Sequence, residues 1–159
     1  MKIAIVHDSI FGNTAKIAEA IADALRPGNE VALLPVGEAK SLALAGLDLL
    51  VVGSPTRGFR PTPAISEYTE GLDSAQLAGT RTAAFDTRIA AEDIHPAPLR
   101  WVVEAGGYAA DRIAASFANK GCVSAGTPGG FVVTGTEGPL REGEIARARD
   151  WALGLARVA

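Results

Sequence analysis

Several residue types that build sites and cross-links are scarce in this chain. Its 159 residues include one cysteine, Cys122, so no disulfide can form within the chain. A lone thiol in an apolar context fits a reducing compartment, and we expect a cytoplasmic protein in which Cys122 is a packed side chain. The two histidines have no metal-ligand spacing; we expect a core or hinge role for His7 and an exposed His95. The sequence therefore predicts neither a disulfide framework nor a metal site.

An excess of positive charge and long apolar runs are also missing. Lysine and arginine together number 15 against 18 aspartates and glutamates, which gives a net charge of −3 and a pI near 5.4. This balance offers no electrostatic attraction to nucleic acid or to an anionic membrane surface. No apolar run approaches the roughly 20 residues that cross a bilayer, and the N-terminus has the pattern of a strand rather than of a signal peptide. We therefore expect no nucleic-acid partner and no membrane association.

Aliphatic residues and glycine are abundant instead. Apolar residues make up 48% of the sequence but aromatic residues only 6%, which predicts a core built mainly from aliphatic side chains. A chain of 159 residues has the usual size of one folding unit, and no internal repeat or low-complexity segment divides it. We therefore expect residues 1–159 to form a single domain.

Short apolar runs of strand length alternate with amphipathic helical patterns along the chain. This alternation is typical of right-handed βαβ units, which place helices on both faces of a parallel sheet. The sequence therefore predicts an α/β fold with three layers, a doubly wound five-stranded parallel sheet in the order 2-1-3-4-5. Strands are expected at 2–7, 31–36, 47–53 and 80–85, with a fifth strand in two parts at 121–125 and 130–133. Helices are expected at 13–25, at 37–45 (short at best), from Pro63 onward, within 106–120 and at 140–158. We also expect a helical turn at 101–105 and a long loop from Asp86 to about Pro98.

Three loops are predicted to meet at one edge of this sheet. In doubly wound sheets ligands bind outside the carboxyl ends of the strands, where the strand order reverses. Ser9–Thr14 leaves the first strand, Ser54–Arg60 leaves the third, and Asp86–Ala91 leaves the fourth. We therefore expect these loops to converge on one ligand.

The first of these loops has the composition of an anion site. The N–H groups in the first turn of a helix are free, and the helix dipole favours negative charge there. Ser9 and Thr14 add hydroxyl donors, Asn13 adds an amide donor, and Gly12 lets the backbone close around a guest. A phosphate suits such a loop, although an ordinary capped turn has the same composition. The triphosphatase pattern G-x-x-x-x-G-K-[ST] and the dinucleotide pattern G-x-G-x-x-G are both missing from it.

The pattern S-x-x-G-N-T-x-x-x-A-x-x-I, which runs from Ser9 to Ile21 after an apolar strand, resembles the phosphate signature of the flavodoxin family. The resemblance implies a flavodoxin-like fold, in which this loop wraps the phosphate of flavin mononucleotide (FMN). His7 departs from the family pattern, which usually has Phe or Tyr at this place.

The second loop shares features with two branches of this superfamily. Gly53–Thr56 resembles the flavin-edge loop of flavodoxins, but Arg57 stands where many of them have a stacking Trp. Pro-Thr-Arg resembles instead the Pro-Thr-Arg-Phe-Gly of the quinone-reductase branch, a partial match because Gly58 here precedes Phe59. Phe59 is expected either to cover a face of the flavin ring or to pack against the following helix.

The third loop, beginning Asp86-Thr87-Arg88, lacks the Tyr with which flavodoxins usually cover the outer ring face. Backbone amides and Thr87 are expected to hold the pyrimidine end of the flavin. Arg88 is either a solvated surface charge or, with Arg57 and Arg60, a positive charge that raises the flavin potential above that of a typical flavodoxin. The residues expected to bind FMN are Ser9, Ile10, Phe11, Gly12, Asn13, Thr14, Ser54, Pro55, Thr56, Arg57, Gly58, Phe59, Asp86, Thr87 and Arg88.

The resemblance leaves more than one function open. The leading hypothesis is an FMN-binding redox carrier between partner proteins, and the alternative is an FMN-dependent NAD(P)H:quinone-type oxidoreductase with small-molecule substrates. A receiver-type signalling module would need a carboxylate after the third strand and a lysine after the fifth, but the third strand ends in Gly53-Ser54 and no lysine follows Lys120. A remnant that has lost its flavin is the last alternative.

Overall fold

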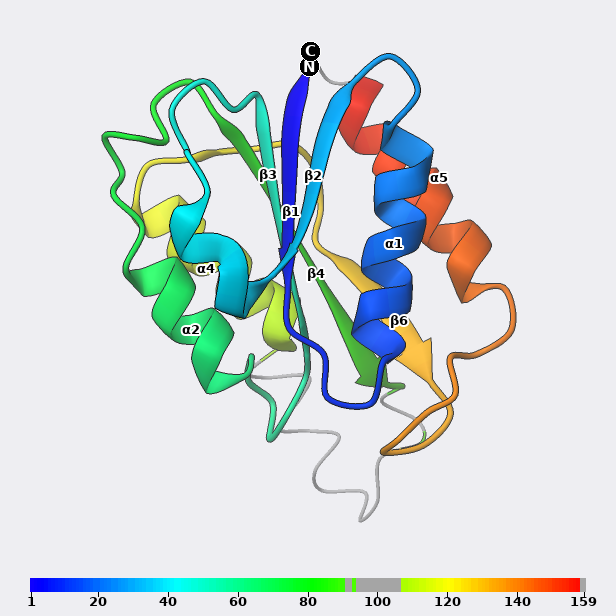
Figure 1. Ribbon diagram of the computed structural model, residues 1–159. Helices are drawn as coiled ribbons and strands as arrows, with labels where there is room; N and C mark the ends of the chain where they lie inside the picture. The colour runs from blue at the N-terminus through cyan, green and yellow to red at the C-terminus, as the bar shows by residue number, and fades with distance from the viewer. Residues whose placement is uncertain (91–92, 94–106, 158–159) are drawn as a thin grey trace.

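The computed structural model describes residues 1–90, 93 and 107–157, and shows a central parallel sheet between two helical layers (Figure 1). Helices α1 and α5 cover one face, and α2, α4 and the 3₁₀ helix η1 cover the other. The elements are β1 (Lys2–His7), α1 (Asn13–Leu25), β2 (Glu30–Pro35), η1 (Val36–Ser41), β3 (Leu49–Pro55), α2 (Pro63–Glu70), β4 (Arg81–Ile89), α4 (Ala109–Asn119), β5 (Val123–Ser124), β6 (Gly129–Val133) and α5 (Glu144–Arg157).

The strand order is β2-β1-β3-β4-β5, with β6 also paired to β4. The two pieces β5 and β6 lie one after the other along β4: Val123 pairs with Arg81, and Val133 pairs with Ile89. Together they occupy the place of one fifth strand that a turn interrupts. The predicted order 2-1-3-4-5 and the predicted interruption are therefore confirmed.

Both faces of the sheet are apolar because helices cover both of them. Along β1 the side chains alternate between the two faces of the sheet. Ile3 and Ile5 belong to the core on the face of α1 and α5, whereas Ala4 and Val6 belong to the core on the face of η1, α2 and α4. All four are at most 1% exposed. This two-sided burial explains why the strand reads as a continuous apolar run.

The termini of two helices follow the sequence signals closely. α1 spans Asn13–Leu25 as predicted. α2 begins at Pro63, and the hydroxyl of Thr62 accepts a hydrogen bond from the Ile65 N–H at 3.4 Å, which is the cap that the Thr-Pro pair predicts.

Some predicted bounds and one predicted buried residue were wrong. The loop expected from Asp86 is strand as far as Ile89, because β6 supplies hydrogen-bond partners for this segment. Ile145, expected to face the sheet, is 36% exposed. The helix expected from Leu140 begins only at Glu144, which is 2% exposed, because Leu140 instead pairs with Val133 in an antiparallel bridge. Glu144 accepts the Val132 N–H at 2.6 Å and pairs with Arg147, so a carboxylate holds this end of α5 on β6.

The predicted helical turn at 101–105 and His95 lie outside the described residues. None of the helices in residues 1–90 and 107–157 combines the length and apolar composition that crossing a bilayer requires.

Candidate functional site

A cavity of about 250 Å³ lies where β1, β3, β4 and β6 end, and we call it the loop cavity. The structure brings the three loops of the sequence analysis together around it. It is lined by Ser9, Ile10, Phe11, Asn13, Thr14, Pro55, Thr56, Arg57, Gly58, Thr87, Arg88, Ile89, Val133 and Thr136.

The loop from β1 to α1 presents unused N–H groups. Ser9 Oγ accepts hydrogen bonds from the N–H groups of Gly12 at 3.1 Å and Ala15 at 3.3 Å, so this hydroxyl fixes the shape of the turn. Gly12 has φ +92°, a left-handed conformation that favours glycine. Within the described part of the chain, the N–H groups of Ile10, Phe11, Asn13 and Thr14 have no acceptor. The loop therefore offers a set of N–H donors to an anion beside the start of α1.

Two side chains of this loop tie it to neighbouring segments. Thr14 Oγ1 and Thr87 Oγ1 are 2.7 Å apart and buried. Only one of these hydroxyls donates to the other, so the second retains a hydrogen for a ligand. The Asn13 amide donates to the Glu137 carbonyl at 3.0 Å, and the resulting contact leaves room only for glycine at position 138. Asn13 thus positions the loop after β6 as well as facing the cavity.

The second loop is held by buried contacts. Ser54 is 0% exposed; its hydroxyl donates to the Pro55 carbonyl at 2.9 Å and accepts the Thr62 N–H at 3.0 Å. A Cβ at Gly53 would collide with the Phe85 ring, which explains the glycine before Ser54. Ser54 therefore fixes the shape of the loop through buried hydrogen bonds and does not line the cavity.

The tip of this loop is a tight turn. Arg57 and Arg60 exchange backbone hydrogen bonds of 2.8 and 3.0 Å around Gly58 and Phe59, whose φ values of 54° and 65° are those of a type I′ turn. The Phe59 carbonyl accepts from Arg112 Nε at 3.0 Å, and Phe59 is not among the lining residues. The aromatic side chain at the cavity is instead Phe11, 45% exposed, with the Arg57 guanidinium 5.7 Å from its ring centroid.

Arg88 is paired rather than solvated, which corrects one of the two interpretations of this residue. Its guanidinium makes two hydrogen bonds, of 2.7 and 2.8 Å, to the Asp86 carboxylate, which is 0% exposed. It also lies over the Tyr108 ring at 3.7 Å from the centroid, and Gly130 leaves space for it. Burial raises the pKa of Asp86, and the hydrogen bonds and charge of Arg88 oppose that shift. The Arg88 charge is therefore largely balanced by Asp86.

Arg57 differs from Arg88 because it is exposed and has no carboxylate partner among residues 1–90, 93 and 107–157. Arg57 thus leaves a positive charge at the cavity mouth.

The sequence analysis missed three lining residues, Ile89, Val133 and Thr136. Ile89 belongs to the predicted third loop, Asp86–Ala91, but only the first three residues of that loop were expected to bind the ligand. Val133 is the last residue of β6 and Thr136 lies in the loop after it. The rule that pointed to the loops after β1, β3 and β4 also applies to this strand end. Of the residues expected to bind a ligand, Gly12, Ser54, Phe59 and Asp86 do not line the cavity.

The donor set fits the phosphate ester of FMN. Phosphate oxygens need several N–H and O–H donors, and the loop supplies free N–H groups and the Thr14–Thr87 hydroxyl pair. The walls beside these donors are apolar or aromatic at Ile10 and Phe11, as a flat ring system requires.

No protein-family model matches the sequence, and no curated protein is similar to it. Solved structures are similar over nearly the whole chain. Oxidised flavodoxin 2 of Bacillus cereus has a TM-score of 0.73 at 21% identity, with 99% of each chain covered. A flavodoxin, WrbA-like protein of Agrobacterium tumefaciens has a TM-score of 0.68 at 15% identity, with 99% of this chain and 96% of that chain covered.

A longer protein contains the same unit. The rubredoxin oxygen:oxidoreductase of Desulfovibrio gigas has a TM-score of 0.71 at 19% identity over 98% of this chain. The match spans only 35% of that protein's length. The TM-scores establish the fold, and at identities of 15–21% the matches establish the fold alone.

Proposed function

Because the chain has a flavodoxin-like fold, we propose that it binds FMN in the loop cavity and carries electrons between partner proteins. The observation that carries this proposal is the loop Ser9–Thr14, whose free N–H groups face a cavity that also contains the Thr14–Thr87 hydroxyl pair. Bound FMN supplies reversible electron transfer.

The residues of the chain hold and tune this group. N–H groups of Ile10, Phe11, Asn13 and Thr14 bind the phosphate, each charge-assisted hydrogen bond contributing roughly 1.5–3 kcal/mol. The aromatic ring of Phe11 offers an apolar surface beside the mouth.

Comparison of FMN with riboflavin tests the phosphate assignment. Riboflavin lacks only the phosphate, so it should bind at least about a hundredfold more weakly than FMN, because the loss of even two charge-assisted hydrogen bonds costs about 3 kcal/mol or more. Quenching of flavin fluorescence on titration measures both affinities. Thr14→Ala should weaken FMN binding and leave riboflavin nearly unchanged, whereas Thr134→Ala, at an exposed threonine outside the cavity, should alter neither. Equal affinities for FMN and riboflavin would contradict the proposal.

The unpaired Arg57 gives a prediction for the bound flavin. A positive charge near the ring stabilises a reduced, negatively charged flavin, so we expect Arg57→Ala to lower the midpoint potential of the FMN-loaded protein by a few tens of millivolts. Arg149→Ala, at an exposed arginine of α5, is the control and should leave the potential unchanged. Redox titration measures the shift; an unchanged or raised potential in Arg57→Ala would show that this charge does not act on the flavin.

A second candidate function is an FMN-dependent NAD(P)H:quinone-type oxidoreductase. Arg57 favours it, since an exposed, unpaired guanidinium at the cavity mouth suits an anionic nucleotide substrate. The assay is oxidation of NADH or NADPH by the FMN-loaded protein with a quinone as acceptor. Turnover without another protein favours the oxidoreductase, and turnover that requires a partner reductase favours the carrier.

A further inference from the structure

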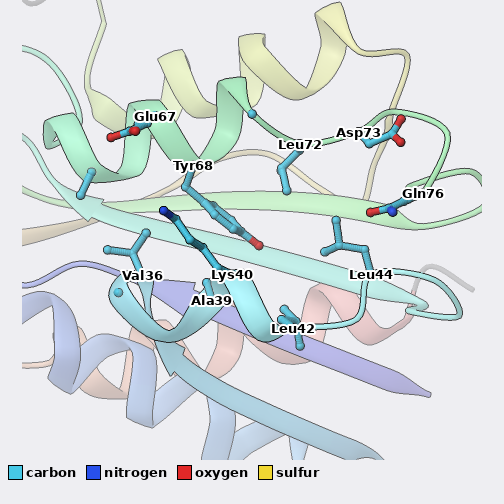
Figure 2. A pocket seen from close by; sticks show the side chains of 13 residues that line it. Val36, Ala39, Lys40, Leu42, Leu44, Glu67, Tyr68, Leu72, Asp73 and Gln76 are labelled. Carbon is cyan, nitrogen blue, oxygen red and sulfur yellow. The ribbon is translucent and has the colours of Figure 1, made fainter.

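A second pocket, of about 520 Å³, lies between η1 and α2 on the face of the sheet that these elements cover (Figure 2). We call it the face pocket. It shares no lining residue with the loop cavity, and its volume is in the range of small-molecule sites. It is lined by Val36, Gly37, Ala39, Lys40, Leu42, Leu44, Ala64, Glu67, Tyr68, Gly71, Leu72, Asp73 and Gln76.

The deep part of the face pocket is apolar. Ala39, Leu44 and Leu72 are 3%, 9% and 8% exposed, and all belong to the core on this face of the sheet. The pocket exists because η1 is a short 3₁₀ helix where doubly wound folds usually place a full crossover helix, so the sheet beneath it is less completely covered.

Tyr68 is the polar group in this apolar setting. Figure 2 shows its ring projecting from α2 towards the segment that carries Lys40 and Leu44. The ring is half-buried, but its hydroxyl oxygen is buried and has no hydrogen-bond partner among the described residues. Burial raises the pKa of Tyr68 to about 12, so the hydroxyl is neutral and remains a donor near neutral pH. A buried hydroxyl without a partner is unfavourable, and a ligand oxygen would satisfy it.

The charged residues lie at the mouth. Lys40, Glu67 and Asp73 are exposed, and none of them takes part in an ion pair within the described part of the chain. One positive and two negative charges disfavour an anionic guest such as a carboxylate or a phosphate. The apolar interior disfavours any charged group, because burial of a charge without a partner is costly. The pocket therefore suits an uncharged molecule.

We propose that the face pocket binds an uncharged, largely apolar small molecule whose carbonyl or hydroxyl oxygen pairs with the Tyr68 hydroxyl. The site is independent of the proposed FMN site because the two share no residue. Failure of FMN binding therefore leaves this proposal standing, and the reverse also holds.

The test uses 2-naphthol and naphthalene, two uncharged aromatic probes that differ only in a hydroxyl group. With ¹⁵N-labelled full-length protein, 2-naphthol should shift the amide resonances of Gly37, Gly71 and Gln76 saturably, with and without added FMN. Tyr68→Phe should weaken 2-naphthol binding roughly three- to tenfold, the worth of one hydrogen bond, and leave naphthalene binding unchanged. No saturable shift, or shifts only in the loop 9–14, would overturn the proposal, as would equal 2-naphthol affinity in Tyr68→Phe.

A filling variant gives a second measurement. Ala64→Phe places a ring in the pocket and should abolish binding of both probes, while Ala45→Phe makes the same change at an exposed alanine outside it and should not.

Tyr68→Phe should melt no lower than the native protein, because the hydroxyl that it lacks had no protein partner. A clear loss of melting temperature would show that the hydroxyl is already satisfied and would overturn the proposal. Concentration-dependent shifts at the pocket without any probe would identify a second copy as the occupant and overturn it as well.

Discussion

At the scale of single residues, close contacts explain sequence features that composition alone leaves unexplained. Glycines at 53 and 130 are required by neighbouring side chains, Phe85 and Arg88 respectively, rather than by backbone conformation. Neither partner is adjacent in sequence, so the glycines of the Gly53–Thr56 motif and of β6 are understood only once the strands are paired.

Gly53→Ala tests the first of these contacts. The added methyl group would collide with the Phe85 ring, which is 0% exposed and packed against Phe131 and Trp151, so it has little room to move. We expect a loss of about 1–3 kcal/mol in the free energy of unfolding, measured by urea denaturation. Gly154→Ala is the matched control, since nothing lies within 4 Å of a Cβ there and α5 should gain up to about 1 kcal/mol. An equal response of both variants would contradict the packing argument.

His7 gives a prediction about pH. Its Nδ1 is buried without a partner in the described residues, and burial lowers the pKa of His7 from 6.5 despite the opposing charges of Asp8 and Glu19. The unfolded chain therefore binds the proton more readily, so the stability contributed by neutral His7 is complete above pH 6.5 and declines as the pH falls through that value. His7→Phe should remove this decline between about pH 7 and pH 5. Urea unfolding at several pH values measures this decline. If the free energy of unfolding falls with pH equally in the native protein and in His7→Phe, the prediction is contradicted.

At the scale of elements, the start of α4 is joined to the loop cavity by one side chain from the loop after β3 and one from β4. Thr56 Oγ1 accepts the Ala109 N–H at 3.1 Å, and Asp86 accepts the Ala110 N–H at 2.9 Å. The first N–H groups of the helix are thus satisfied by residues that also shape the site. Asp86 in turn holds Arg88, so strand, helix and cavity wall form one connected unit.

Arg88→Leu tests this unit. It would leave the Asp86 carboxylate buried without its cation, which typically costs about 3–5 kcal/mol of stability at neutral pH. Protonation of Asp86 removes the unpaired charge, so the stability difference from the native protein should narrow as the pH falls from 7 towards 5. Chemical denaturation across this range is the measurement. A difference that stays constant with pH would show that packing, and not charge, is lost.

How much of each element was predictable depended on whether its signals are local. The bounds of α1 and the cap of α2 follow from neighbouring residues and were predicted correctly. The extension of β4 through Asp86 depends on pairing with β3 and with β6, and β6 lies more than forty residues later in the chain. The polar residues Asp86-Thr87-Arg88 indicated a loop, because the strands that pair with this segment are distant in the sequence.

At the scale of the whole molecule, the strand order explains where most of the candidate site lies. The order 2-1-3-4-5 brings the ends of β1, β3 and β4 together, and the first loop and most of the second line the loop cavity as the strand order predicts. The face pocket was not predicted, although the sequence indicated that the helix after the second strand would be short. The pocket also depends on the direction in which Tyr68 points, which a pattern of apolar positions does not give.

Binding of FMN should stabilise the folded chain as a whole. A ligand that binds only the native state adds about 2.7 kcal/mol when its free concentration is a hundred times the Kd. For a chain of this length that corresponds to a rise of roughly 5–11 °C in Tm. Thermal unfolding followed by circular dichroism measures it, with riboflavin at the same concentration as the control. Equal rises with both flavins would argue against a role for the phosphate.

The division of the fifth strand into β5 and β6 has a consequence for behaviour at high concentration. An unbroken outer strand exposes a long row of unpaired amide and carbonyl groups, onto which a strand of another molecule can add. Here the turn between Ser124 and Gly129 breaks that row, and β5 itself is only two residues long. The interruption therefore protects this edge of the sheet from aggregation, and a variant with the turn shortened to give one continuous strand would be more prone to form intermolecular sheets.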